Sequence, residues 1–169
     1  TLLPSCDNIA PNPSFETGTP GNHNVPGSWA FYGGTPAYIG VANDFFVDGT
    51  QSFKIQSSGN TDAGIYAQVT GLTPGQAISL SVYARTDANV VNANVVLDTT
   101  QHGLSGAKTQ ALHVGASNDS RVAIINFIVD ISAVNIFIGL GSFGSNSGGT
   151  VWYDDVMLEQ SATAGAYCP

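Results

Sequence analysis

Apolar and polar residues alternate with a period of two through most of this chain, and this pattern constrains its fold more than any other feature. Successive side chains of a strand point to opposite faces, so such alternation indicates strands with one buried face. In the stretch AISLSVYAR, an apolar set alternates with a polar and aromatic set: Ile78, Leu80, Val82 and Ala84 against Ser79, Ser81, Tyr83 and Arg85. No segment keeps a helical period of 3.6 residues over three turns, so we expect no helix.

About ten segments of this kind follow one another at regular spacing, as in all-β sandwiches and barrels. Turn sequences separate them, such as GLTPGQ at 71–76 and SNSGG at 145–149. The pattern predicts an all-β fold, an antiparallel β-sandwich of jelly-roll type, in a single domain over residues 1–169. The stretch RVAIINFIV, residues 121–129, is apolar on both faces and is therefore predicted to be a central strand.

Charged residues are scarce. They make up 9% of the 169 residues, and 12 acids against 4 bases give a net charge of −8. Four scattered cations cannot follow a phosphate backbone, so the composition argues against nucleic acid and anionic membranes as partners. No apolar run approaches the ~20 residues of a membrane-spanning helix, so we expect no membrane insertion. Neutral partners, or cations, remain.

The two cysteines, Cys6 and Cys168, lie at opposite ends of the chain. A disulfide between them would tie the termini together, whereas two free thiols are the alternative. We predict the disulfide, which implies an oxidising compartment. The sequence begins at Thr1 rather than Met, as a processed secreted protein would, so we expect a secreted, extracellular protein.

Several predicted strands carry aromatic and amide side chains on their outward faces. A sugar ring offers an apolar C–H face that stacks on an aromatic ring, and hydroxyl groups that bond to amides and guanidinium groups. The outward residues therefore form a candidate sugar-binding set: Tyr66, Gln68, Tyr83, Arg85, Asn92, Asn94, Asn135 and Phe137.

Four motifs, in order and across nearly the whole chain, carry a resemblance to a known group: NPSFETG (12–18), DGTQSFKI (48–55), VTGLTPGQAISLSVYAR (69–85) and VWYDDVMLE (151–159). Together they resemble the carbohydrate-binding modules of the family 4, 9, 16 and 22 group. The resemblance implies a jelly-roll sandwich and a non-catalytic domain that binds a neutral poly- or oligosaccharide. It also places Tyr66 and Phe137 near strand positions that line the cleft in some members.

The same resemblance implies a structural calcium ion that joins the first and last strands. Its ligands would be three carboxylates and two backbone carbonyls, those of Glu16, Asp48 and Asp154 and those of Ser14 and Gln51. Asp155 competes with Asp154 for its place. Calcium takes six to eight hard oxygen donors, which carboxylates and carbonyls supply. Alternatively, these acids are solvated at strand ends.

The chain departs from the group where cleft aromatics often lie. The residues just before the GIYAQV strand are Asp62 and Ala63, and the TTQHGLSG stretch offers only His102. Aromatic residues in loops could replace them: Trp29, Phe31, Tyr32, Phe45 and Phe46. We expect Trp29 and Trp152 in the core, and the three histidines at surface or turn positions.

Two other functions stay open. An adhesion module would use the same sandwich to bind protein, which the low charge and the mean hydropathy of +0.10 allow. A small glycan-degrading enzyme would need paired carboxylates or, for a lyase, a base beside a cation. Tyr83 and Arg85 are the one pair of the second kind, and the candidate carboxylates share no outward face: Asp44, Asp62, Asp87, Asp98 and Asp130.

Overall fold

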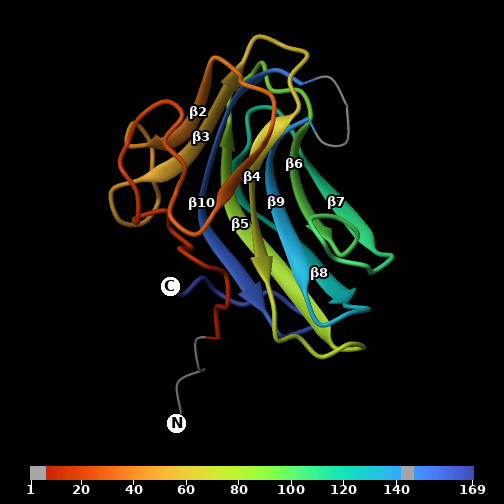
Figure 1. Ribbon diagram of the computed structural model, residues 1–169. Helices are drawn as coiled ribbons and strands as arrows, with labels where there is room; N and C mark the ends of the chain where they lie inside the picture. Colours follow the sequence, from red (N-terminus) through yellow and green to blue (C-terminus); the bar gives the residue numbers. More distant parts are fainter. Residues whose placement is uncertain (1–6, 142–146) are drawn as a thin grey trace.

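The protein is a sandwich of two antiparallel five-stranded sheets (Figure 1). The computed structural model describes residues 7–141 and 147–169. Sheet A has the strand order β1–β4–β9–β6–β7, and sheet B has the order β2–β3–β10–β5–β8. The described residues contain no helix, and therefore none long and apolar enough to cross a membrane. The prediction of an all-β jelly-roll sandwich is confirmed.

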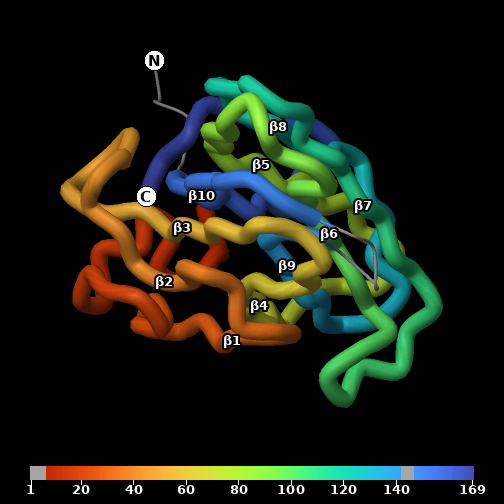
Figure 2. Tube along the Cα trace, turned by 90° about the horizontal axis from the view of Figure 1, so that it is seen from above, coloured from red at the N-terminus to blue at the C-terminus, as the bar shows by residue number. Residues whose placement is uncertain are grey.

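Figure 2 shows the two layers from above, with β10 between β3 and β5 in sheet B and β9 between β4 and β6 in sheet A. Sheet A comprises β1 (Ala30–Gly33), β4 (Ala63–Val69), β9 (Val134–Leu140), β6 (Ala93–Asp98) and β7 (Thr109–Val114). Sheet B comprises β2 (Tyr38–Ala42), β3 (Ser52–Ser57), β10 (Gly149–Glu159), β5 (Ala77–Thr86) and β8 (Asp119–Ile128).

The core lies between the sheets and consists of the inward side chains that the alternation predicted. Its largest aliphatic members are fully buried: Ile65, Ile136 and Ile138 from sheet A, and Ile55, Ile78 and Leu80 from sheet B. Tyr153 of β10 crosses this core. Its hydroxyl donates to the backbone carbonyls of Asn94 at 3.2 Å and Gly139 at 2.8 Å, which links sheet B to sheet A through a satisfied buried polar group.

The two tryptophans lie in different environments. Trp29 is 6% exposed, and its indole nitrogen donates to the carbonyl of Pro11 at 2.9 Å, so the prediction of a core position is confirmed. The same prediction for Trp152 is wrong. Its neighbours Val151 and Tyr153 point inward and are 0% exposed, so the alternation of β10 turns the half-buried Trp152 to the outer face of sheet B.

The prediction of a central strand at residues 121–129 is also wrong, because β8 lies at the edge of sheet B. A bulge explains why its sequence is apolar on both faces. Asn126 has φ +53°, and the pairing with β5 shifts register between Ile124 and Phe127. Both of these residues therefore point inward and are 2% exposed, whereas Ile125 is 53% exposed.

A second bulge lies in β10, where Asp155 and Val156 stand opposite a single residue of β5. Asp155 has φ +51°. The N-terminal segment runs beside this bulge, because the amide of Val156 donates to the carbonyl of Pro13 at 2.8 Å and that of Ile9 to the carbonyl of Leu158 at 3.0 Å. The front of the described chain is thus attached to its last strand.

Candidate functional site

The outward side chains of sheet A lie in three transverse rows, because the register sets residues of neighbouring strands directly opposite one another. The rows are Tyr32–Gly64–Gly139–Asn94, Tyr66–Phe137–Val96 and Gln68–Asn135–Asp98–Thr109. The middle row is aromatic and aliphatic, and the third row is polar. An aromatic strip beside amide groups is an arrangement that a sugar ring and its hydroxyls can use.

An aromatic cluster occupies the middle of this face. The Tyr66 and Phe137 rings are stacked at 5.6 Å, and the imidazole of His102 stacks on Tyr66 at 3.9 Å with an interplanar angle of 17°. Tyr32 meets Phe137 edge-on at 5.2 Å. Phe137 is only 5% exposed, whereas Tyr66 is half-buried and His102 is exposed. The imidazole and the edge of Tyr66 are therefore the parts of the cluster that a ligand can reach.

Two facing glycines let Tyr32 lie flat against this sheet. A Cβ atom on Gly64 or Gly139 would come within 2.7 Å or 2.5 Å of the Tyr32 hydroxyl oxygen. Burial raises the pKa of this hydroxyl above its usual value, and the charge of Asp62 raises it further. Tyr32 thus fills the first row and closes one end of the aromatic cluster.

The β6–β7 loop is held over the third row by Asp98, which is 0% exposed. Its Oδ1 accepts from the hydroxyls of Thr100 at 2.7 Å and Thr109 at 2.6 Å. Its Oδ2 accepts from the backbone amides of Thr100 at 3.1 Å and Gln101 at 3.0 Å, and from the amide of Asn135 at 3.4 Å. Burial alone would raise the pKa of Asp98, but these hydrogen bonds outweigh it and hold the pKa below its usual value.

Two amide side chains connect this network to the aromatic cluster. Gln68 donates to the carbonyl of His102 at 3.2 Å and to the side-chain oxygen of Asn135 at 3.1 Å. Asn135 in turn donates to the carbonyl of Gln101 at 2.9 Å. The loop residue that carries the exposed imidazole is therefore positioned by hydrogen bonds from two strands of sheet A.

The predicted sugar-binding residues fall on both sheets. Five of them lie on sheet A: Tyr66, Gln68, Phe137, Asn135 and Asn94. The last three of these are buried. Asn92 lies just before β6. Tyr83 and Arg85 lie on the outer face of sheet B. The two groups therefore face opposite sides of the sandwich and cannot meet the same sugar ring. A period of two does not say which sheet a strand joins.

His102 and Tyr32 complete the sheet A face. We expected His102 at a surface or turn position, and it is exposed with φ +53°, yet its ring also covers Tyr66. It lies in the TTQHGLSG stretch, to which the resemblance drew attention, and that position was the sequence signal for it. Tyr32 was one of the loop aromatics and is part of β1.

Two of the predicted calcium ligands, Glu16 and Asp154, bind backbone amides of the β2–β3 loop. The carboxylate of Glu16 accepts from the amides of Thr50 at 3.0 Å and Gln51 at 2.9 Å. A Cβ atom on Gly49, which has φ +70°, would come within 2.3 Å of that carboxylate, so the turn requires glycine. Gln51 also donates to the carbonyl of Phe15 at 2.9 Å.

Asp154 holds the other side of the same loop. It is 0% exposed, and its Oδ2 accepts from the amides of Val47 at 2.7 Å and Asp48 at 3.2 Å. Burial raises the pKa of Asp154 to about 7, and the charge of Asp155 adds to that rise against the lowering effect of the hydrogen bonds. Glu16 and Asp154 thus attach the β2–β3 loop to the first segment and the last strand.

Asp155 is the acid in this region whose bonding is incomplete. It is 5% exposed, and its buried Oδ1 has no hydrogen-bond partner among residues 7–141 and 147–169. Burial raises its pKa to about 6, and the charges of Asp48 and Glu16 raise it further while Arg121 lowers it. An orphaned buried carboxylate oxygen close to two further carboxylates fits a hard cation.

No three acidic, histidine or cysteine side chains in the described part of the chain are placed to share one metal ion. A cation at Asp155 would therefore depend on backbone carbonyls as well as on carboxylates, as the predicted roles of Ser14 and Gln51 require.

The described chain ends lie close together. Asn8 donates to the carbonyls of Cys168 and Val156, each at 2.9 Å, and accepts from the amide of Leu158 at 3.1 Å. Cys6 lies outside the described residues, so the Cys6–Cys168 disulfide stays a prediction.

No protein-family model and no curated protein sequence matches this chain. Solved structures share its fold. A family 61 carbohydrate-binding module in complex with β-1,4-galactotriose is 17% identical, with a TM-score of 0.65 over 91% of this chain and 99% of that one. A family 4 module is 16% identical, with a TM-score of 0.55 over 88% and 97%. The C-terminal family 22 module of Clostridium thermocellum Xyn10B is 14% identical, with a TM-score of 0.56 over 91% and 94%. The resemblance to these modules is confirmed at the level of the fold.

Proposed function

We propose that the chain is a non-catalytic carbohydrate-binding domain that takes a neutral poly- or oligosaccharide on the outer face of sheet A. The observation that carries this proposal is the stacked pair of Tyr66 and exposed His102, at 3.9 Å, beside the amide of Gln68. A sugar ring would lie against the imidazole and the edge of Tyr66, with its hydroxyls toward Gln68. The likeness to modules that bind β-1,4-galactotriose and xylan supports this class of ligand.

A neutral ligand and a non-catalytic role suit the charges of this face. The three rows of this face contain one acid, Asp98. Both of its carboxylate oxygens already accept the hydrogen bonds that hold the β6–β7 loop. A glycosidase needs two carboxylates about 5–9.5 Å apart on either side of the bond that it cleaves. The net charge of −8 disfavours polyanionic glycans.

The Tyr66→Ala substitution should weaken glycan binding by about 10-fold or more, because it removes the ring that supports His102 and exposes Phe137. A panel of immobilised polysaccharides that includes β-1,4-galactan and xylan identifies the ligand, and calorimetric titration then gives Kd. Tyr66→Phe keeps the ring and serves as the matched control with near-normal affinity. Equal affinity of Tyr66→Ala and wild type would exclude this face.

An adhesion module is the second candidate, and the edge strand β8 is the observation that favours it. Ile125 and Ile128 are 53% and 39% exposed there, and an apolar edge strand is suited to pair with a partner chain. Failure to bind any glycan on the panel would favour this function.

We propose further that a structural calcium ion binds at Asp155, with Glu16, Asp48 or Asp154 and the carbonyls of Ser14 and Gln51 as other ligands. The unpaired buried Oδ1 of Asp155 supports this proposal. Calcium would neutralise the gathered carboxylates and join the N-terminal segment to β10.

Calcium at about 100 times its Kd should stabilise the fold by about 2.7 kcal/mol, which corresponds to a rise in Tm of about 5–10 °C. Thermal unfolding in calcium and in EDTA measures this rise. Asp155→Asn should abolish it, whereas Asp130→Asn, at an exposed acid remote from the site, should retain it. A Tm that is the same in calcium and EDTA argues against the ion.

We also propose that the protein is secreted and that Cys6 and Cys168 form a disulfide. The position of Asn8 against the carbonyl of Cys168 supports the pairing, because Cys6 is only two residues before Asn8.

A further inference from the structure

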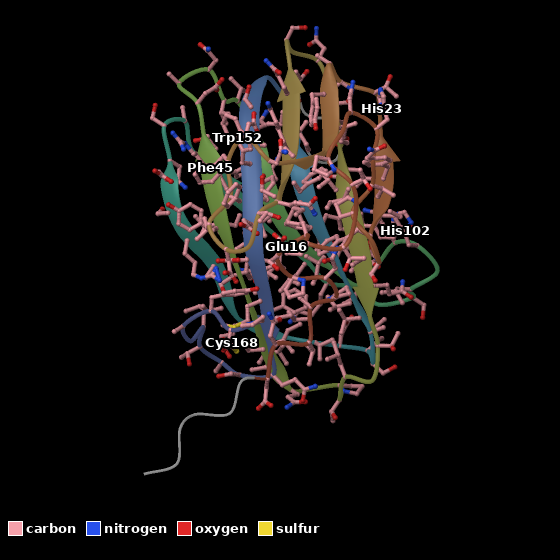
Figure 3. All side chains as sticks on the ribbon, turned by 90° about the vertical axis from the view of Figure 1, so that its left-hand side faces the viewer. Glu16, His23, Phe45, His102, Trp152 and Cys168 are labelled. Carbon is pink, nitrogen blue, oxygen red and sulfur yellow. The ribbon has the colours of Figure 1, made fainter. Side chains whose placement is uncertain are left out.

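The outer face of sheet B carries a second group of aromatic residues, remote from the Tyr66 cluster. Figure 3 shows Phe45 and Trp152 close together on one side of the sandwich and His102 on the other. The Phe45 ring lies 6.1 Å from Trp152 and 6.3 Å from Tyr83. All three side chains are half-buried, so each keeps part of its ring surface open to solvent. We name these three residues, with Tyr38, Lys54 and Arg85, the sheet B platform.

Two of the four cations of the chain flank these rings. Trp152 stands between Lys54 of β3 and Arg85 of β5, directly opposite both in the register. The Lys54 ammonium lies 5.3 Å from the Trp152 ring and 5.1 Å from that of Tyr38. The Arg85 guanidinium lies 4.5 Å from the Phe45 ring. Such contacts fix the rings in place by cation–π attraction.

The polar groups at and beside the platform include both donors and acceptors. Asp44 accepts from the indole nitrogen of Trp152 at 2.9 Å and from Lys54 at 2.6 Å. Tyr83 donates to Asp119 at 2.5 Å. The side chain of Arg85 is exposed and makes no hydrogen bond or ion pair with the described residues, so its guanidinium N–H groups are available to a ligand. Sugar hydroxyls can donate to a carboxylate and accept from a guanidinium group, and Asp44 and Arg85 both lie at Trp152.

A polar pocket of about 450 Å³ continues the platform toward the end of the strands. Gln56 and Thr150 line it, and they stand two residues along β3 and β10 from Lys54 and Trp152, on the same face. Two residues of a strand span about 6.8 Å, so the pocket begins within about 7 Å of the platform along β3 and β10. The pocket is lined by further groups that bond hydroxyls, among them Asn60, Asp87 and Asn89.

We propose that this face is a second carbohydrate-binding surface, independent of sheet A, on which a neutral sugar unit stacks at Trp152 and Phe45 and the adjoining unit enters the pocket. The choice of a carbohydrate as the ligand rests on the proposed function, whereas the residues of this surface are identified independently of it. The carboxylates of Asp44, Asp87 and Asp119 at its borders repel phosphate groups, so nucleic acid and anionic lipid do not suit it.

The placement of the two tryptophans makes this proposal directly testable. Trp29 is 6% exposed in the core, whereas Trp152 is half-buried on the platform. The three rows of sheet A contain no tryptophan. Intrinsic fluorescence therefore reports on sheet B when β-1,4-galactotriose, xylohexaose or another glycan that the panel retains is added. Calorimetry of the same titration counts the sites.

We expect two sites per chain and a fluorescence change that persists in Tyr66→Ala. Phe45→Ala and Arg85→Gln, the second at an exposed residue, should each raise the Kd of the site that fluorescence reports by about 10-fold. Both variants should leave the Tyr66-dependent site intact, and their Tm values verify that they fold. Binding without a fluorescence change, or a change lost in Tyr66→Ala alone, overturns the platform and keeps the function of sheet A. Binding only through the platform overturns sheet A instead, and no binding to any glycan overturns both.

Discussion

Replacing Cys6 and Cys168 together by serine should lower the free energy of unfolding by as much as about 5 kcal/mol, with a fall in Tm of about 10–20 °C. The predicted disulfide would close a loop of nearly the whole chain, and the stabilisation comes from restricting the unfolded state. Asn8 already holds the N-terminal segment against Cys168 and β10, so we expect the disulfide to form without a change in the folded state.

Denaturant unfolding of the double variant and of wild type, without reductant, measures this difference. Wild type in excess reductant should unfold at the same denaturant concentration as the variant, which separates the disulfide from any effect of serine. Rapid alkylation of both cysteines in native, unreduced protein would contradict the prediction, because two thiols would then be present.

Asp98→Ala should lower the free energy of unfolding by about 3–5 kcal/mol and release the β6–β7 loop, because five hydrogen bonds to a buried carboxylate disappear and their donors lose their partner. Thr109→Val removes one of these bonds and should cost about 1 kcal/mol. Hydrogen exchange at the amides of Thr100 and Gln101 should rise sharply in the alanine variant. The Tyr66–His102 pair should lose its support, so glycan binding to sheet A should fall with stability.

The pH dependence gives a second readout for Asp98. Its folded pKa lies below the usual value, so its stabilising contribution is complete above the unfolded pKa of about 3.9 and is lost as the pH falls through the folded pKa. Wild type should therefore lose stability more steeply than Asp98→Asn below about pH 4. Asp130→Asn is the comparison variant: this exposed acid follows β8 and accepts from the amide of Ala107 in the β6–β7 loop. That hydrogen bond also lowers the pKa of Asp130, so Asp130→Asn should flatten the acid loss of stability less than Asp98→Asn does. Equal slopes for Asp98→Asn and wild type would contradict the role of Asp98.

The expectations from sequence held where a single strand decides the outcome. Alternation within one strand correctly placed Ile78, Leu80 and Val82 in the core, because the direction of a side chain follows from its position along the strand. They failed at β8. The bulge at Asn126 shifts the alternation of inward and outward side chains by one residue, so the sequence of this edge strand is apolar on both faces.

The surroundings of Trp152 also could not be predicted from a single strand. We predicted a core position for it, but the alternation of VWYDDV turns it outward. Its actual environment, between Lys54 and Arg85 and next to Phe45, exists only because β3, β10 and β5 are neighbours and the β2–β3 loop folds over them.

The sequence by itself determined the fold class, the inward and outward faces of most strands and the chemistry of the outward residues, since these depend on local periodicity and residue type. Only the tertiary structure decided which outward residues meet. Tyr66 and Tyr83 are both outward tyrosines of alternating strands, but one lies on sheet A and the other on sheet B. Strand pairing between distant segments is set by the packing of the whole chain, and no period within a strand encodes it.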